Sequence, residues 1–325
     1  MRKLILNNKQ VKLPFFMPVA TKLSTKLVSL KEVEELGYET VISNSFLLYL
    51  NPGLEFIKKA KYLRGFTNTN LNFFTDSGGF QLLYDNFFES ITEKGIKFRS
   101  PYDRSLHLIT PEKSMEIQAK LNSDVVMCLD YMPRYKDSKK DIEKSVNLTY
   151  QWAKRCKESY KGKRKLFCII QGGVYKDLRK KSAEGLISLD FDGYAIGGLG
   201  IGENREEMFK AVESVIDLIP KDKVRYLMGI GTPLDVKRFI KLGVDVFDST
   251  YPTKSARHNL VFNSDNNLDL EKGKFKNDFK CIDPEIEISK DFSRAYLHHL
   301  IKINEPLAKR IMTLHNLEYM KKLMS

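Results

Sequence analysis

Residues 193–250 read GYAIGGLGIGENREEMFKAVESVIDLIPKDKVRYLMGIGTPLDVKRFIKLGVDVFDST, and this stretch decides the fold. Three short apolar runs, at 193–200, 225–231 and 244–250, are typical of buried strands and end in small or polar residues. The two segments between them have helical spacing and open on Asn or Thr-Pro, which are helix-start signals. This alternation predicts parallel strands joined by helices.

The same alternation extends towards the N-terminus. Five further β-rich runs lie at 15–21, 40–46, 72–77, 124–130 and 166–173, which brings the number of candidate strands to eight. Eight strand–helix units predict a (β/α)8 TIM barrel over residues 1–260. A doubly wound open sheet is the alternative, but no GxGxxG motif follows the first strand.

Two segments fall outside the repeating unit. Residues 82–123 form a long connection that includes the hairpin-like pattern GIKFRSPYDRSLHLI, so we predict an insertion after the third strand. Residues 261–325 follow the last strand–helix unit and are expected to form a small helical subdomain packed on the barrel.

The composition is that of an ordinary globular protein, with 325 residues, 42% apolar and 29% charged. No apolar run approaches the roughly 18–20 residues that a membrane span needs, and the start MRKLILNN is too short for a signal peptide. The four cysteines form no CxxC pair, so the sequence encodes neither a disulfide framework nor a zinc ribbon. A reduced, cytoplasmic location is the expectation.

The net charge of +13 is unevenly distributed. Residues 131–165 carry 12 Lys and Arg against four Asp and Glu, which is +8 of the total. A basic face indicates a polyanionic partner, whereas a solvated helix explains the same residues without any partner. Charge alone leaves both interpretations open.

Polar groups recur where the predicted strands end. In a TIM barrel these ends meet at one mouth, so Asp76, Asp130, Asp248 and Gln171 are expected to converge together with several glycines. A single Asp after a strand more often caps the next helix, but three at equivalent positions favour a site. Two carboxylates across a pocket suit acid–base and nucleophilic chemistry at an acetal-like carbon.

Five motifs have a specific resemblance: TDSGGFQ (75–81), IIQGGVYKDLR (169–179), IGGLGIGE (196–203), RYLMGIGTP (225–233) and FDSTYPTKSARHN (247–259). In this order they resemble the tRNA-guanine transglycosylase family, and the likeness runs from about residue 12 to the C-terminus. The resemblance implies a pentosyltransferase that replaces an anticodon-loop guanine, expected at the wobble position, with a 7-deazaguanine base of queuosine biosynthesis. It implies no redox cofactor, and tRNA as partner.

The resemblance also implies roles for individual residues. Asp248 matches the nucleophile that forms a covalent ribosyl intermediate, and Asp76 matches the general acid–base. Lys254 and Arg257 match basic residues that contact the anticodon loop. The remaining matches bind the base: Ser77 beside Asp76, Asp130 at its N1/N2 edge, Gln171 and Gly198 at its exocyclic oxygen, Leu199 at its 7-substituent, and Phe80 and Met228 on its two faces, with Gly229 adjacent.

The identity of the incoming base rests on the turn after Gly-Gly-Leu. Ile201 is bulky there, as in bacterial relatives, and favours the small 7-aminomethyl-7-deazaguanine over queuine with its cyclopentene arm. Gly200, Tyr131 and Met132 depart from the common bacterial residues, so queuine stays an alternative.

The main departure from the family concerns its zinc site. The three expected cysteines of CxCxxC fall on Pro284, Ile286 and Ser289, and only the histidine is retained, as His315. One histidine cannot close a tetrahedral site, even together with Cys281, which lies three residues out of register, so we predict no zinc. A divergent site that uses the nearby Asp283, Glu285 and Glu287 is the alternative. Because the family's dimer uses this subdomain, both a homodimer and a heterodimer stay open.

Three other functions compete with this one. A non-catalytic tRNA-binding partner subunit would tend to lose the nucleophile, whereas Asp76 and Asp248 are both present. A relative that acts on DNA guanine would share the motifs. A barrel enzyme acting on a small nucleoside leaves the basic residues at 254–257 unexplained.

Overall fold

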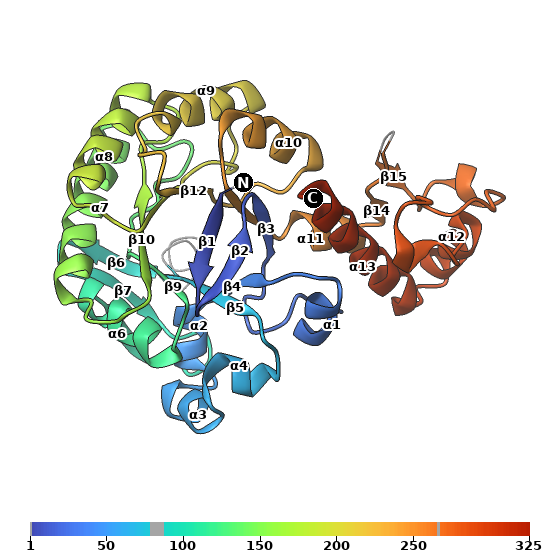
Figure 1. The fold of residues 1–325 in the computed structure, drawn as a ribbon, viewed down its shortest axis with the longest axis horizontal. Helices are drawn as coiled ribbons and strands as arrows, with labels where there is room; N and C mark the ends of the chain where they lie inside the picture. The colour runs from blue at the N-terminus through green and yellow to red at the C-terminus, as the bar shows by residue number, and fades with distance from the viewer. Residues whose placement is uncertain (1, 79–87, 265–266) are drawn as a thin grey trace.

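The chain forms an eight-stranded parallel barrel surrounded by helices, as the computed structural model of residues 2–78, 88–264 and 267–325 shows (Figure 1). The strand order is β3-β13-β12-β11-β10-β9-β5-β4, and Val19 pairs with Ile42 to bring the two outer strands together. This confirms the predicted (β/α)8 class. The strands are β3 (Phe15–Pro18), β4 (Thr40–Asn44), β5 (Asn72–Asp76), β9 (Val125–Met127), β10 (Lys165–Ile170), β11 (Gly193–Ile196), β12 (Val224–Leu227) and β13 (Val246–Ser249).

Several helices around the barrel begin at capping residues that the sequence indicates. Asn204 closes a capping box with Glu207 at the start of α9, and Thr232 accepts from the Asp235 amide before Pro233 in α10. The helices are α1 (Leu30–Glu35), α2 (Ser45–Leu50), α3 (Leu54–Lys59), α4 (Tyr62–Thr67), α6 (Pro111–Leu121), α7 (Lys139–Ser159), α8 (Lys176–Ser188), α9 (Arg205–Ile216), α10 (Pro233–Leu242) and α11 (Tyr251–Arg257).

A hairpin closes the N-terminal end of the barrel. It consists of β1 (Lys3–Leu6) and β2 (Lys9–Lys12), and its Leu4, Leu6 and Val11 pack with the apolar side chains of the barrel interior. The Asn7 side chain bonds Asn72 and Asp124, which lie at the start of β5 and just before β9. Because this end is filled, the barrel opens at its C-terminal mouth.

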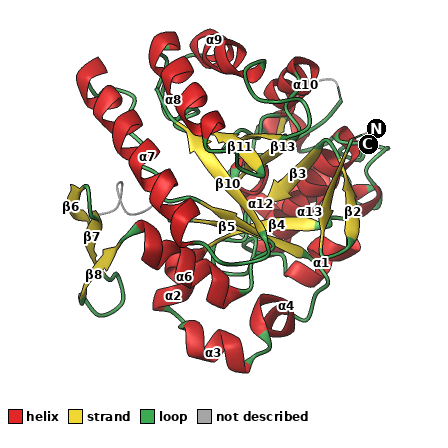
Figure 2. Ribbon diagram, turned by 60° about the vertical axis from the view of Figure 1, so that its left-hand side comes forward, coloured by secondary structure: helices red, strands yellow, loops and turns green. Residues whose placement is uncertain are grey.

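The segment predicted as an insertion after the third strand contains a small antiparallel sheet of β6 (Phe88–Thr92), β7 (Gly95–Arg99) and β8 (Leu106–Ile109), followed by α6 (Figure 2). The hairpin-like pattern of the sequence corresponds to β7 and β8. Phe98 on the inner face packs edge-on against Phe46 of α2, and Trp152 of α7 donates to the Glu93 carbonyl. The sheet is therefore fixed to the outside of the barrel.

The C-terminal residues form a subdomain that extends to one side of the barrel (Figure 1). It comprises β14 (Leu260–Val261), β15 (Leu268–Asp269), two 3-10 turns (Gly273–Phe275 and Glu287–Ser289), α12 (Arg294–Lys302) and α13 (Pro306–Leu323). Its apolar core is separate from that of the barrel and includes Leu270, Ile282, Leu297 and Met312. Among the described residues, no helix is long and apolar enough to span a membrane.

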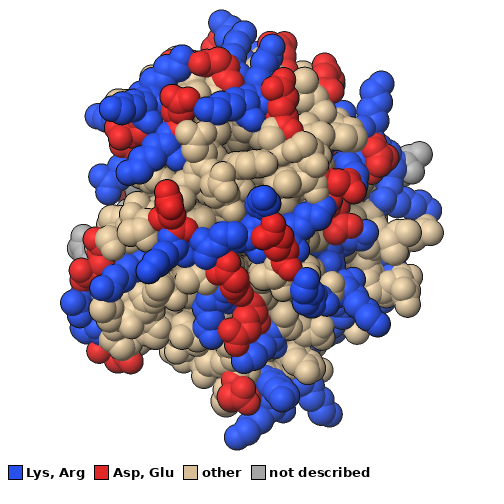
Figure 3. Space-filling view, turned by 90° about the vertical axis from the view of Figure 1, so that its left-hand side faces the viewer, with Lys and Arg blue, Asp and Glu red and all other residues tan. Residues whose placement is uncertain are grey.

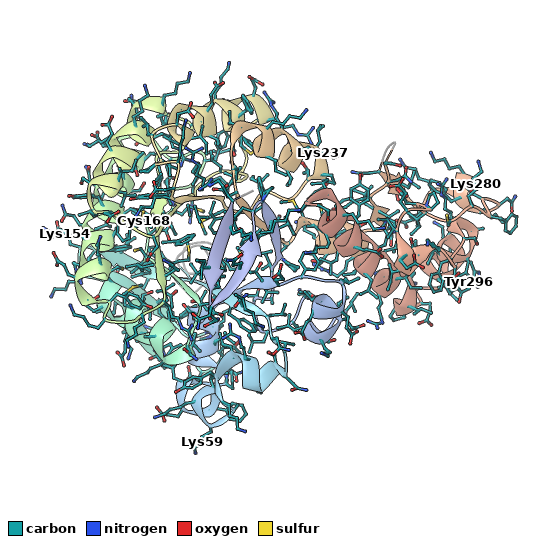
Figure 4. The ribbon with its side chains drawn as sticks, viewed as in Figure 1. Lys59, Lys154, Cys168, Lys237, Lys280 and Tyr296 are labelled. Atoms are coloured by element: carbon teal, nitrogen blue, oxygen red, sulfur yellow. The ribbon has the colours of Figure 1, made fainter. Side chains whose placement is uncertain are left out.

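The basic block at 131–165 lies mostly on the outer surface, around α7. Lys139 pairs with Asp177 of α8 at 2.7 Å, and Arg155 pairs with Glu112 of α6 at 2.7 Å. Figure 3 shows basic and acidic side chains interspersed on this face, and Figure 4 shows Lys154 at the rim of the helix ring, with Cys168 inside it. This pairing favours a solvated helix over a polyanion-binding face for that block.

Candidate active site

The mouth of the barrel holds a cavity of about 410 Å³, and most of the residues predicted for the site line it. These are Asp76, Asp130, Gln171, Gly198, Leu199, Met228, Gly229, Asp248 and Lys254. Ser77 reaches the cluster through Asp130, and Arg257 lies on α11 without lining the cavity. Phe80 lies outside the described residues.

Asp248 sits at the end of β13 with two donors on the same oxygen. The Tyr226 hydroxyl donates to Oδ1 at 2.5 Å, and the Gly229 amide donates to it at 3.0 Å. Burial raises the pKa of Asp248, and these two hydrogen bonds oppose that rise. One carboxylate oxygen is thus held in place, while Oδ2 receives no such hydrogen bond from the described residues.

Asp76 ends β5 and faces the same cavity. Burial and the charges of Asp130 and Asp248 together raise its pKa to about 7, although the Gly78 and Ser77 amides partly offset the rise. A carboxyl group with this pKa can both take up and release a proton near neutral pH. The two carboxylates therefore differ in their surroundings: a side-chain hydroxyl bonds Asp248, whereas two neighbouring carboxylate charges add to burial in raising the pKa of Asp76.

Asp130 and Gln171 form a buried pair. The Gln171 Nε2 donates to Asp130 Oδ2 at 2.7 Å, and the Ser77 hydroxyl donates to Oδ1 at 3.5 Å. Burial raises the pKa of Asp130 to about 6. The Gln171 Oε1 is buried and has no partner among the described residues, so this amide keeps unused hydrogen-bonding capacity beside the cavity.

A glycine-rich turn after β11 forms the wall next to Gln171. Gly198 has φ +64°, and a Cβ there would lie 2.3 Å from Gln171 Oε1, so only glycine fits. The Glu203 carboxylate accepts from the Gly200 and Ile201 amides. Because C=O and N–H point in opposite directions in a trans peptide, the Leu199 carbonyl faces away from Glu203.

The two basic residues after β13 differ in their surroundings. Lys254 is exposed at the mouth of the cavity. Arg257, one turn further along α11, is half-buried, and burial lowers its pKa. Its Nη1 is buried with no partner among the described residues.

The residues at the family's metal positions do not fit a metal. Pro284 offers no ligand atom, Ile286 is a buried apolar side chain, and the Ser289 hydroxyl lies 2.8 Å from His315 Nδ1. The other ring nitrogen of His315 lies 2.6 Å from the Phe262 carbonyl. Both nitrogens are therefore occupied by protein groups.

Comparison with known proteins identifies the family. A family profile described as queuine tRNA-ribosyltransferase matches residues 1–325. The chain belongs to this family. Its members of that name include proteins from Thermodesulfovibrio yellowstonii (43% identity over 94% of this chain and 81% of theirs), Halothermothrix orenii (42%; 96% and 84%) and Acinetobacter baumannii strain SDF (43%; 99% and 87%). The predicted tRNA-guanine transglycosylase family, an enzyme family of tRNA processing, is confirmed.

Sequence reasoning missed two residues of this site. Tyr226 lies two positions before Met228 at the end of β12, so the period of a strand places both on the inner face, which is a signal that the sequence does contain. Glu203 closes the IGGLGIGE motif three residues after the turn that it caps. Both residues act through hydrogen bonds, and the sequence motifs do not show which groups these residues bond.

Proposed function

We propose that this enzyme exchanges a guanine of tRNA for a 7-deazaguanine base through a covalent Asp248–ribosyl intermediate. The observation that carries the proposal is the pair of carboxylates in one cavity, Asp248 oriented by Tyr226 and Gly229 and Asp76 with a pKa of about 7. Membership of the queuine tRNA-ribosyltransferase family supports tRNA as the substrate.

In the first displacement, an oxygen of Asp248 attacks C1′ of the target nucleotide. The bond between C1′ and the base nitrogen breaks through an oxocarbenium-like state, and guanine leaves with the bonding pair and with a proton donated by Asp76. Since Tyr226 and Gly229 hold Oδ1, the Oδ2 atom is the one available for attack.

In the second displacement, Asp76 removes the proton from the incoming base. The freed nitrogen attacks C1′ and releases the Asp248 carboxylate. A base with a pKa near 7 is suited to this transfer, because it is ionised in part and still accepts a proton readily at neutral pH. The two steps need no external energy source.

Base recognition follows from exchange of partners at Asp130. A guanine-type edge presents two donors, and an ionised carboxylate accepts both. Occupied in this way, Asp130 no longer needs the Gln171 Nε2, which can then turn to the exocyclic oxygen of the base beside the Gly198 amide. The Asp130–Gln171 hydrogen bond thus orients both side chains before a base binds.

The walls of the cavity favour a small 7-substituent. Ile201 and Met132 line the cavity next to Leu199, whose carbonyl suits a cationic aminomethyl group. Queuine would require room for a ring at this wall. We therefore infer 7-aminomethyl-7-deazaguanine as the incoming base and queuine as the poorer substrate.

Two further inferences concern the C-terminal subdomain. Both ring nitrogens of His315 lie within hydrogen-bond distance of protein groups, and from this we infer a subdomain that folds without zinc. The subdomain also carries the stacked aromatics Phe292 and Tyr296, together with Phe279, which is 80% exposed. We infer that they contact a second copy of this chain in a homodimer.

Incorporation of radiolabelled guanine into tRNA by the purified chain tests the function. The wild-type protein should incorporate label and form a denaturation-resistant RNA adduct, and Asp248→Asn should do neither, whereas exposed Asp217→Asn should do both. A wild-type chain that binds tRNA without exchange would indicate a non-catalytic subunit. Incorporation into DNA but not tRNA would contradict the proposed substrate.

A further inference from the structure

Arg179 is a buried cation that the mechanism above does not use. It lies in the first turns of α8 with no solvent exposure, and burial lowers its pKa to about 9. Its donors reach three backbone carbonyls: Nε to Gly173 at 2.7 Å, Nη1 to Ile170 at 2.8 Å and Nη2 to Gly198 at 3.4 Å. Because carbonyl groups are neutral, none of these three hydrogen bonds pairs the buried guanidinium with an opposite charge. The guanidinium instead orients the three backbone carbonyls.

The three carbonyls belong to the two segments that read the base. Ile170 and Gly173 lie on either side of Gln171 in the chain. Gly198 follows β11, the strand next to β10, and lines the cavity. The Ile170 carbonyl also accepts from the Gly197 amide, so Arg179 sits at the junction of β10 and β11. A single side chain therefore fixes both segments relative to one another.

The loop after β10 packs closely against the start of α8. A Cβ at Gly172 would lie 2.7 Å from the Arg179 amide nitrogen, which shows how closely the loop approaches the start of α8. The Gln171 amide donates to Ser182 Oγ of the same helix at 3.1 Å. With Arg179 on the carbonyl of that peptide and Ser182 on its N–H, the backbone of Gln171 is held from both sides.

We propose that Arg179 is a positioning residue that sets Gln171 and Gly198 at the spacing needed to bond the exocyclic oxygen of one base. This inference deepens the proposed function and rests on it. The planar fork of a guanidinium can hold three carbonyls in fixed directions, which the point charge of a lysine cannot do. Arg179 touches no reacting atom.

Arg179→Lys and Arg179→Met test this role, with Arg225→Lys and Arg225→Met as matched controls. Arg225 is also buried and donates to a backbone carbonyl, that of Ile219 at 2.8 Å, but it lies at the start of β12, the end of the strand opposite the cavity. Calorimetry measures the Kd of guanine and of 6-thioguanine, which keeps the N1–H and N2–H donors but carries sulfur, a weaker acceptor, in place of the exocyclic oxygen. Differential scanning calorimetry measures Tm for each variant.

The Arg179 variants should weaken guanine binding about 10-fold or more and bring the ratio of the guanine and 6-thioguanine Kd values close to one. The Arg225 variants should keep both values within about twofold of the wild type. Loss of Tm without a change in this ratio would overturn the proposal, since that is the effect of a purely structural arginine.

Exchange of labelled guanine into tRNA is measured on the same samples to separate the two proposals. A wild-type chain that binds guanine with the expected discrimination but never exchanges it contradicts the proposed function and leaves Arg179 supported. Normal exchange by the wild type, together with an unchanged ratio of Kd values in the Arg179 variants, supports the proposed function and contradicts the role of Arg179. Absence of both binding and exchange in the wild type overturns both.

Discussion

The carboxylates at the mouth of the barrel owe their positions to the strands that carry them, and the groups that bond them come from neighbouring strands and loops. Asp76, Asp130 and Asp248 lie at strand ends, and the strand–helix alternation alone brings them to one mouth. Tyr226 and Arg179 were not predicted to act there, because their contacts depend on which neighbouring strand or loop they reach. Sequence spacing gives the face on which a residue lies but not its partner.

Tyr226→Phe should lower kcat by roughly 10- to 100-fold, because it removes a hydrogen bond to a charged group that is worth about 1.5–3 kcal/mol. Without that donor the pKa of Asp248 should rise, so the acidic limb of the kcat–pH profile should move to higher pH. Steady-state exchange at several pH values measures both effects. Tyr194→Phe is the control, since the Tyr194 hydroxyl bonds the Phe191 amide outside the site. An unchanged profile would contradict the role given to Tyr226.

Asp76→Asn should stabilise the fold at pH 8 but not at pH 4. The pKa of Asp76 is about 7 in the fold against an ordinary value of 3.8 in the unfolded chain, so its stabilising contribution is full below pH 4 and is lost as pH rises through 7. This difference corresponds to at most about 4 kcal/mol. Thermal unfolding from pH 4 to pH 8 should show the two Tm curves separating up to pH 7. Exposed Asp217→Asn should follow the wild type, and parallel curves for Asp76→Asn would refute the argument.

At the scale of elements, the sequence predicted all eight barrel strands, but several of the predicted runs extend beyond the strands. The run at 193–200 forms a strand only over Gly193–Ile196, because Gly198 and Gly200 take positive φ and turn the chain into the cavity wall. Apolar residues after a strand look the same in sequence whether they continue it or line a pocket. The sequence pattern therefore does not predict the last residue of a strand that is followed directly by a site.

The segment that ends in the 3-10 turn Glu287–Ser289 packs on α13 through the hydrogen bond between Ser289 and His315. Treatment with a chelator should leave the Tm of the chain unchanged, and elemental analysis should find no stoichiometric zinc. Ser289→Ala removes the hydroxyl that bonds His315 and should cost about 1 kcal/mol, or roughly 1–2 °C in Tm for a chain of this length. Ser188→Ala, at an exposed hydroxyl that bonds the Gly185 carbonyl, is the control. One zinc per chain, lost together with stability on chelation, would contradict this prediction.

For the whole molecule, the net charge of +13 left open both a polyanionic partner and a solvated surface. The +8 block proved to lie mostly around α7, where its residues form ion pairs with α6 and α8. Lys254 at the mouth is a single residue that no charge count would single out. Function at this scale follows from which end of the barrel is open, and the β1–β2 hairpin decides that.

The oligomeric state of the chain depends on an exposed aromatic surface of the C-terminal subdomain. Tyr296 is 44% exposed at the outer end of the subdomain and stacks on Phe292, so the pair presents an apolar surface away from the barrel (Figure 4). Tyr296→Asp should shift the chain from dimer to monomer at micromolar concentration, because a charge placed in an apolar contact is costly to desolvate. The Tm should change little, since the side chain packs on the surface. Sedimentation equilibrium measures the mass, and Tyr102→Asp, at an equally exposed tyrosine on the β7–β8 turn, should remain dimeric. A wild-type chain that stays monomeric at tens of micromolar, or a Tyr296→Asp variant that stays dimeric, would show that this surface does not hold two copies together.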